Sequence, residues 1–474
     1  MKKIAPAICL LMLFCACSRG PAPAALLPVG VFDSGTGGLT VLEKILTLDE
    51  FDNASGAPGA DGIPDFADED FQYLADQANM PYGVYDAQGK ADLLRRLVRD
   101  DAGFLLGDSF WSEDGAELSG SKAPCKILVI ACNTATAYGL EDVWAMLEGS
   151  GTRVIGVINA GVKATLDLLE GDPGEKAAGP LAIGVLATPG TISSGAYERT
   201  IREELSRRGS TREVEVVNQA GYGFAEAVDA EPDYVNPSLT EPRGSYRGPR
   251  IGTSDASIKE ELLPVYNFAP EGLLYRQAKG VRLDLQLNSA ANYARFNMVS
   301  LIERHRLSGS RTPIRAIILG CTHYPFEIAT LERVIAEMRD YSKDGAYPYR
   351  ELLPEDLVLV DPARYTAIEC YESLRADGLL HPGRQDNTPS RQASASQTSQ
   401  PRTVRAFISI PAPGLDAGLL SPEGGLSFEY KYGRDALADD SGTRQVLFSD
   451  GNISPATRER ISALLPACAG EIFP

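Results

Sequence analysis

Short runs of aliphatic residues alternate with helix-like segments along most of this chain. The runs Leu181 to Leu186 and Ala316 to Leu319 have the length of strands, while 194–207 and 289–303 have the length and composition of helices. A strand that is apolar along its whole length must be covered on both faces, as in a parallel sheet between helices. The alternation therefore predicts an α/β protein with mainly parallel sheets.

Two of the aliphatic runs end in a cysteine that is followed by polar residues. These residues are Cys132, Asn133 and Thr134 after the run 127–130, and Cys321, Thr322 and His323 after the run 316–319. In a parallel sheet such positions lie at the carboxyl ends of the strands, where ligands bind. We therefore expect one site that both cysteines face.

A glycine-rich turn follows the first strand. Asp33 ends the strand 29–33, Ser34 opens the turn, and an apolar-periodic helix begins at Leu39. The free N–H groups at such a helix N-terminus favour a carboxylate or phosphate. Alternatively, the turn only packs the helix on the sheet, and Asp33 only caps the helix.

The composition is that of a soluble globular protein, and 474 residues are enough for two domains. The formal net charge of −19 argues against binding to nucleic acid or to anionic membrane surfaces, which need clustered Lys and Arg.

The first residues have the pattern of an export signal. Two lysines precede an apolar run that is too short to span a membrane, and Cys17 ends a segment that resembles a bacterial lipobox. We expect a signal at 1–17, lipidation at Cys17 and a tether at 18–28, so that the protein lies in the cell envelope and meets the membrane only through its lipid anchor. The alternatives are an ordinary cleaved signal, or a cytoplasmic protein if the signal is not used.

Several segments interrupt or follow the α/β pattern. They are an acidic insertion at 49–70, a proline-rich insertion at 229–285, a low-complexity linker at 384–403 that we expect to be disordered, and a C-terminal extension at 404–474 of unclear fold, with short strands expected at 404–410, 426–430 and 444–448. Asp61, Asp65 and Asp68 of the acidic insertion are the oxygen ligands that calcium prefers, although a solvated loop is the favoured interpretation.

The chemistry of the two cysteines has three interpretations. A metal site would need more ligands at close spacing than two cysteines and one histidine supply. A Cys132–Cys321 disulfide fits an oxidising compartment, but a buried cystine does not need the polar residues that follow each thiol. The third interpretation is a pair of reactive thiols around a small polar ligand. Cys125, Cys370 and Cys468 are expected to be buried fillers or to form one disulfide.

Six blocks of this sequence resemble the glutamate racemases of the aspartate/glutamate racemase superfamily. The blocks are Gly30 to Leu42, Tyr73 to Gly83, Ala131 to Thr136, Ile155 to Ile158, Ile183 to Tyr197 and Leu319 to Pro325, in the order that the family has them. The resemblance covers about 29–370. It implies two similar lobes with the active site in the cleft between them: lobe 1 from 29–150 and 331–380, and lobe 2 from 151–330.

The resemblance also implies a two-base mechanism without cofactor or metal. One cysteine removes the α-proton of a small acidic amino acid and the other returns a proton to the opposite face, with Cys132 assisted by Asp33 and Cys321 by His323. Thiols of ordinary pKa need such neighbours. The residues implied in substrate binding are Asp33, Ser34, Tyr82, Gly83, Asn133, Thr134, Thr322 and His323.

Two departures from the family pattern stand near these blocks. Asn159 and Ala160 replace a Glu-Pro pair, and the segment from Asn218 to Val228 lacks the Cys-Pro of the family. Export also differs from the cytoplasmic supply of D-glutamate to the cell wall that is usual in the family. We expect glutamate as the substrate; aspartate, another isomerase reaction and an idle binding lipoprotein are the alternatives, and a homodimer stays open.

Overall fold

The computed structural model describes residues 24–170, 180–278, 281–383, 402–422, 424–437 and 442–473. The expected signal, Cys17, and all but the last two residues of the expected linker lie outside these ranges. Within them, no helix is both long enough and apolar enough to cross a membrane.

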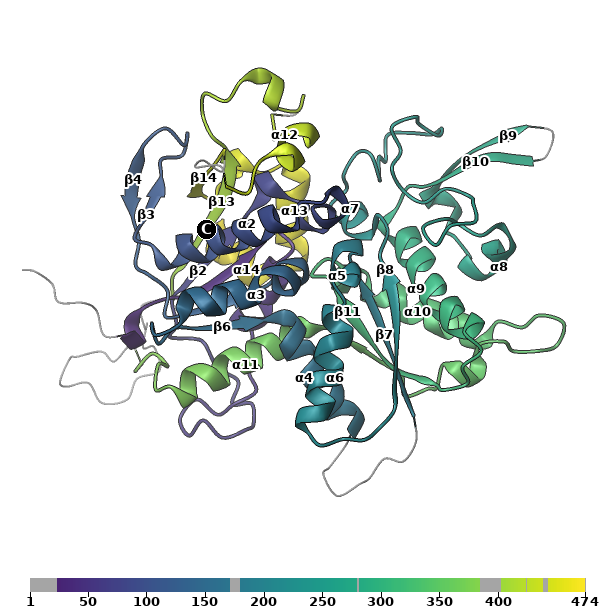
Figure 1. Ribbon diagram of the computed structural model, residues 1–474, viewed down its shortest axis with the longest axis horizontal. Coiled ribbons are helices and arrows are strands. Elements are labelled where there is room, and N and C mark those ends of the chain that lie inside the picture. Colours follow the sequence, from purple (N-terminus) through teal and green to yellow (C-terminus); the bar gives the residue numbers. More distant parts are fainter. Residues whose placement is uncertain are drawn as a thin grey trace, which may run out of the picture.

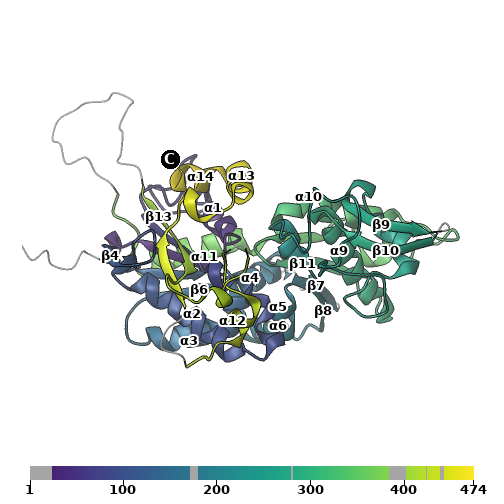
Figure 2. The same cartoon turned by 90° about the horizontal axis from the view of Figure 1, so that it is seen from above.

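Two mainly parallel sheets form two lobes that lie side by side (Figures 1 and 2). The sheet of lobe 1 has the order β14-β13-β2-β1-β5-β6, and that of lobe 2 has the order β12-β11-β7-β8. The strands of lobe 1 are β1 (Val29–Asp33), β2 (Phe71–Ala75), β5 (Ile127–Ile130), β6 (Arg153–Gly156), β13 (Val404–Pro411) and β14 (Thr443–Leu447); those of lobe 2 are β7 (Leu181–Ala187), β8 (Val214–Ala220), β11 (Ile314–Gly320) and β12 (Val358–Val360). All of these pairings are parallel except that of β13 with β14. The predicted α/β class with two lobes is thus confirmed.

Helices cover both faces of each sheet. The α-helices are α1 (Leu39–Leu46), α2 (Ala91–Leu106), α3 (Asn133–Leu147), α4 (Val157–Glu170), α5 (Pro189–Ser193), α6 (Ala196–Arg207), α7 (Phe224–Val228), α8 (Leu263–Tyr266), α9 (Ala290–Leu307), α10 (Ile328–Asp340), α11 (Pro362–Ala376), α12 (Phe428–Gly433), α13 (Pro455–Leu464) and α14 (Pro466–Ile472). Two antiparallel hairpins form small sheets of their own: β3 (Ser109–Trp111) with β4 (Leu118–Ser121), and β9 (Leu273–Ala278) with β10 (Val281–Leu287).

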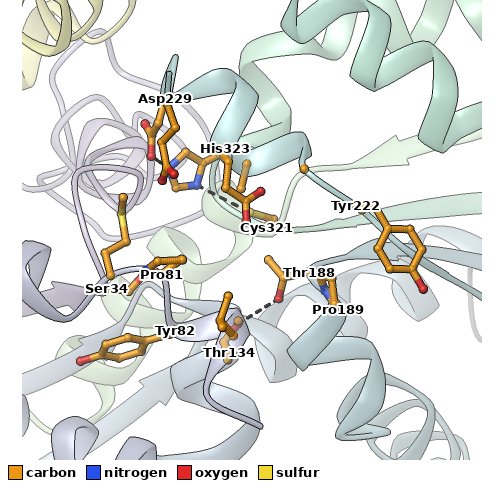
Figure 3. A pocket seen from close by; sticks show the side chains of 18 of the residues that line it. Ser34, Pro81, Tyr82, Thr134, Thr188, Pro189, Tyr222, Asp229, Cys321 and His323 are labelled. Atoms are coloured by element: carbon orange, nitrogen blue, oxygen red, sulfur yellow. Dashed lines mark hydrogen bonds and ion pairs between the residues drawn. The ribbon is translucent and has the colours of Figure 1, made fainter. Parts of the chain in front are cut away.

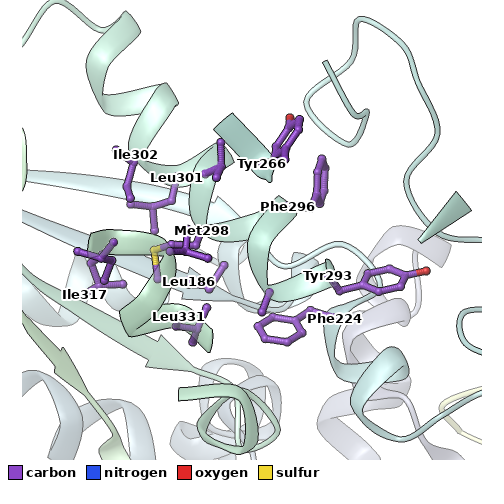
Figure 4. Close-up of a cluster of buried hydrophobic side chains, with 14 of the residues drawn as sticks. Leu186, Phe224, Tyr266, Tyr293, Phe296, Met298, Leu301, Ile302, Ile317 and Leu331 are labelled. Atoms are coloured by element: carbon purple, nitrogen blue, oxygen red, sulfur yellow. The ribbon is translucent and has the colours of Figure 1, made fainter. Parts of the chain in front are cut away.

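The alternation of side chains along each strand separates the apolar core into layers. In lobe 1, Val31 points to the layer under α1, α11 and α14, whereas its neighbour Phe32 points to the layer under α2 and α3. In lobe 2, one layer lies against α9 and α10 and the other against α4 and α6. Figure 4 shows the α9 side of lobe 2, where Phe296, Met298 and Leu301 pack among residues of neighbouring elements.

The lobe boundaries differ from the expected ones in two places. β6, expected in lobe 2, pairs with β5 at the edge of the lobe 1 sheet. Residues 331–340 and 358–360, expected in lobe 1, belong to α10 and β12 of lobe 2, and the chain returns to lobe 1 only with α11. The order of segments in the sequence does not decide to which lobe each belongs, because strand pairing joins segments that are far apart in the chain.

The C-terminal extension is an integral part of lobe 1. β13 lies between β2 and β14, with Val404 paired to Phe71, so it is an inner strand of the sheet. The segment expected as a strand at 426–430 instead begins the short helix α12, because the Ser427 hydroxyl accepts the N–H of Tyr430 and caps that helix.

This role of β13 predicts a large effect of Phe407→Ala. Phe407 is fully buried, and its ring lies 5.1 Å from that of Phe104. We expect the change to lower the free energy of unfolding by about 3–5 kcal/mol, measured by urea titration. The control is Leu447→Ala, because Leu447 is the register partner of Phe407 on β14 but is 42% exposed. Equal, small losses in both variants would contradict an inner β13.

Candidate active site

The site lies where the strands of both lobes end. Asp33 is the last residue of β1, Cys132 follows β5 by two residues, and Cys321 directly follows β11. Parallel pairing brings the carboxyl ends of the strands of one sheet to the same edge, and here the two edges face each other. Between them is a cavity of about 350 Å³.

All of the residues that the sequence singled out for catalysis or substrate binding line this cavity. They are Asp33, Ser34, Tyr82, Gly83, Cys132, Asn133, Thr134, Cys321, Thr322 and His323. Figure 3 shows Ser34, Tyr82 and Thr134 from lobe 1 opposite Cys321 and His323 from lobe 2. Their proximity follows from the fold; their individual roles remain predictions.

Cys132 is held by the first turn of α3 and by the glycine turn. Its Sγ accepts the N–H of Ala135 (3.4 Å) and lies 3.7 Å from the Ser34 hydroxyl. Burial, and after it the nearby Asp33 carboxylate, raises the pKa of the Cys132 thiol. In this geometry Cys132 is a protonated thiol, which is the form that can donate a proton.

Asp33 organises the glycine turn from beneath. Its Oδ2 accepts the N–H groups of Gly35 (3.2 Å) and Gly38 (2.8 Å). Burial raises the pKa of Asp33, although His323 and the Gly38 N–H oppose this effect. A Cβ on Gly38 would lie 2.3 Å from that of Asp33, so the carboxyl group fits beneath the turn only because this residue is glycine. Asp33 can therefore bind the N–H groups of the glycine turn and also take part in the site.

His323 joins Cys321 to a carboxylate of lobe 2. Its Nδ1 lies 3.6 Å from Cys321 Sγ, and its Nε2 lies 2.9 Å from Asp229 Oδ2 (Figure 3). Burial lowers the pKa of His323, but the contacts with Asp229 and Cys321 outweigh it, so that the net pKa lies well above the ordinary value. His323 therefore becomes positively charged more readily than an ordinary histidine, and it lies next to the Cys321 sulfur.

Asp229 is a site residue that sequence reasoning missed. Burial raises the pKa of Asp229, but His323 and the guanidinium of Arg460 together lower it below the ordinary value. The loosely matching segment from Asn218 to Val228 stops one residue before it, and position 229 was assigned to an insertion. The sequence signal that could have found it is the position of this carboxylate nine residues after the segment that forms β8.

Tyr82 lines the cavity, but its hydroxyl is directed elsewhere. The Oη atom lies 2.5 Å from Asp76 Oδ2 and 2.9 Å from Asp101 Oδ2, beneath the surface of the cavity. Two buried carboxyl groups thus engage the Tyr82 hydroxyl, and the participation of Tyr82 in substrate binding stays a prediction. Any contact with a ligand would come from the rest of the residue or from Gly83.

Polar side chains also connect the lobes across the site. Thr134 Oγ1 lies 3.0 Å from both Thr188 Oγ1 and Thr191 Oγ1, and the Tyr197 hydroxyl donates to Asn133 Oδ1 (2.6 Å). These contacts join the start of α3 in lobe 1 to α5 and α6 in lobe 2. They fix the separation of the two cysteine-bearing strand ends.

Residues after β8 complete the wall of the cavity. Glu226 precedes the expected insertion, whereas Glu231, Tyr234 and Arg247 belong to it. Burial raises the pKa of Glu226 and raises that of Glu231 to about 8. Because a carboxyl group is mainly protonated below its pKa, Glu231 is mostly neutral near pH 7. A negatively charged ligand would thus meet less repulsion than the sequence suggests.

In the part of the chain that the structure describes, the side chains considered for a disulfide, a metal site or a calcium site are not grouped with the partners that such sites need. Cys125, Cys132, Cys321, Cys370 and Cys468 are buried and free, and no three His, Cys, Asp or Glu side chains in the described ranges are grouped to hold a metal ion. Asp61 and Asp65 accept backbone N–H groups of their own loop, for example from Asn53 and Glu50.

Known proteins similar to this chain are glutamate racemases. That of Aquifex pyrophilus is 34% identical over 175 residues, which are 37% of this chain and 50% of that protein; that of Roseobacter denitrificans is 28% identical over 60% of this chain and 89% of that protein. That of Thermus thermophilus is 26% identical over 75% of this chain and 82% of that protein. This chain thus spans half of the Aquifex relative and most of the other two. No protein-family model matches the chain.

Solved structures of glutamate racemases are also similar to this chain. The isoform RacE1 of Bacillus anthracis is 22% identical, covers 75% of this chain and 84% of its own, and has a TM-score of 0.42. The Thermus thermophilus enzyme, solved in complex with beta-chloro-D-alanine, is 22% identical, covers 81% of this chain and 87% of its own, and has a TM-score of 0.41.

The contact between Asp229 and His323 predicts the effect of Asp229→Asn on the imidazole. Loss of the carboxylate leaves burial as the main influence, so we expect the pKa of His323 to fall by about one unit or more, measured by NMR titration of the histidine side chains. His305 and His381 are internal references, and Asp356→Asn, which removes an exposed partner of Arg315, is the control. An unchanged His323 titration would contradict the contact.

Proposed function

We propose that this chain, a homologue of the glutamate racemases, is an amino-acid racemase that interconverts L- and D-glutamate. The observation that carries the proposal is the pair Cys132 and Cys321, which come from opposite lobes and line one cavity. Bases from two lobes can flank a substrate that lies between them, as inversion of a carbon centre requires.

The proposed reaction consists of two proton transfers at the α-carbon. In one direction the Cys321 thiolate, next to His323, takes the α-proton, and the electron pair stays on the α-carbon and its carboxylate as a carbanion. The Cys132 thiol then gives its proton to the opposite face. The product leaves Cys321 as a thiol and Cys132 as a thiolate, which is the arrangement that the reverse direction needs. No other co-reactant enters the proton balance.

Polar groups on both sides of the cavity are suited to hold the substrate. The hydroxyls of Ser34, Thr134 and Thr322 and the amide of Asn133 lie around it and can bind carboxylate and ammonium groups. Glu231, whose pKa burial raises to about 8, lowers the repulsion of a second carboxylate while it is protonated. These features support a small acidic amino acid, with aspartate as the second substrate to test.

We further propose that the activity is located in the cell envelope, with Cys17 as the lipid-bearing residue and the product D-glutamate serving the cell wall. The lipobox-like segment before Cys17 supports this location. The thiols would then have to stay reduced outside the cytoplasm. Burial of Cys132 and Cys321 and their separate positions on two lobes support that requirement.

Exchange of the α-proton with solvent tests the reaction directly. Purified protein in D₂O should introduce deuterium at the α-carbon of both enantiomers of glutamate, followed by ¹H NMR, with inversion followed by circular dichroism. Cys132→Ala and Cys321→Ala should each lower inversion by about 10²–10⁴-fold, because each removes an acid/base group. Cys370→Ala is the control, since Cys370 is buried in lobe 1 away from the cavity. Absence of exchange with both enantiomers of glutamate and aspartate would refute the proposal.

The raised pKa of Glu231 predicts that substrate binding depends on pH. Below its pKa of about 8 the Glu231 carboxyl group is neutral, and above it the group is an anion that repels an acidic substrate. We therefore expect the KM for glutamate to rise as the pH increases through about 8, and expect Glu231→Gln to flatten this rise. Glu198→Gln, on the exposed face of α6, is the control. If the KM of Glu231→Gln rose with pH as it does in the wild type, the pH dependence would belong to another group.

A further inference from the structure

Arg460 of the C-terminal extension reaches the wall of the candidate active site. It lies on α13, about 90 residues beyond the part of the chain that resembles the racemases, and its side chain is 17% exposed. The guanidinium group contacts both lobes: Nη1 donates to the carbonyl of Val228 (2.7 Å), and Nη2 donates to Thr36 Oγ1 in the glycine turn (3.3 Å). Figure 1 shows α13 next to α7.

The same guanidinium group forms an ion pair with Asp229. Arg460 Nη2 lies 2.5 Å from Asp229 Oδ1, while the other oxygen of that carboxylate is the partner of His323. A continuous series of contacts therefore runs from Arg460 through Asp229 and His323 to Cys321. Each oxygen of Asp229 has its own cationic partner, so the carboxylate cannot turn away from His323 without losing one of them.

The position of α13 is itself fixed by the docking of the extension. α14 follows α13 directly, and its first N–H groups, from Ala467 and Cys468, donate to the Glu43 carboxylate on α1. The Cys468 thiol donates to the carbonyl of Leu39 at the start of the same helix. Since α1 begins at the end of the glycine turn, the extension is anchored on the helix that directly follows Thr36 and its turn.

We propose that Arg460 is a positioning residue that holds Asp229, and through it His323, for proton transfer at Cys321. This proposal rests on the proposed racemase function. Arg460 also shares the negative charge of Asp229 with His323, so that the imidazolium is bound less tightly than it would be by an unshared carboxylate. The other titratable groups that influence His323 are Asp33, Cys321, Glu226 and Glu231.

The kinetic test compares Arg460→Met with Arg458→Met. Arg458 lies on the same helix but pairs with Asp450 at the surface, so its loss should leave the activity unchanged. We expect Arg460→Met to lower kcat about 10²-fold with little change in KM, because the catalytic groups lose their alignment while the substrate contacts remain. Arg460→Lys should restore part of kcat, since one charge returns without the fork that contacts Asp229 and Val228 together.

Two further readouts separate positioning from a general loss of structure. The primary isotope effect with α-deuterated substrate should increase in Arg460→Met for the enantiomer whose proton goes to Cys321 and not for the other. The pH at which His323 titrates in the kcat profile should rise by about one unit or more, because the positive charge of Arg460 no longer opposes protonation of His323. Equal isotope effects on both enantiomers, or a kcat equal to that of the wild type, would overturn the proposal.

An NMR titration tests the contact without any activity. The chain has three histidines, so the side-chain signal of His323 can be assigned with His323→Gln. In Arg460→Met the His323 signal should titrate at higher pH than in the wild type, while those of His305 and His381 stay in place. If the wild type shows no α-proton exchange but His323 responds, the proposed function fails and the contact stands. If exchange occurs and His323 does not respond, the role of Arg460 fails alone.

Discussion

Parallel strand pairing is the constraint on which the rest of this structure depends. Hydrogen bonds between parallel strands bring their carboxyl ends to one edge of the sheet, and each lobe turns that edge toward the other. Cys132 and Cys321 are 189 positions apart in the sequence, yet both lie on such edges. The cavity, the glycine turn and the polar contacts between the lobes all follow from this arrangement.

The surroundings of the two cysteines are not equivalent. Cys132 is buried beside the carboxyl group of Asp33, which disfavours a second negative charge. Cys321 lies beside His323, whose cationic form Asp229 stabilises. The two thiols thus have different neighbours, a carboxyl group beside Cys132 and an imidazole beside Cys321.

The C-terminal extension links fold and site. Its first strand, β13, lies inside the sheet of lobe 1, and its helix α13 carries Arg460 to the boundary between the lobes. The contact of Arg460 with Thr36 on one side and Val228 on the other adds a connection between the lobes beyond those made by Thr134 and Asn133. A segment outside the family-like region therefore supports both the core and the cavity wall.

Local sequence patterns determined the α/β class, the strand ends that carry Cys132 and Cys321, and the glycine turn after Asp33. These features depend on periodicity and on residues that are neighbours in the chain. Tertiary structure alone decided that β13 is an inner strand, that β6 belongs to lobe 1 and that β12 belongs to lobe 2. It also decided the direction of the Tyr82 hydroxyl and the contacts of Asp229 with His323 and Arg460. The physical reason is that sheet pairing and the pairing of buried charges join residues that are distant in the chain, and no local pattern records which distant partner will satisfy them.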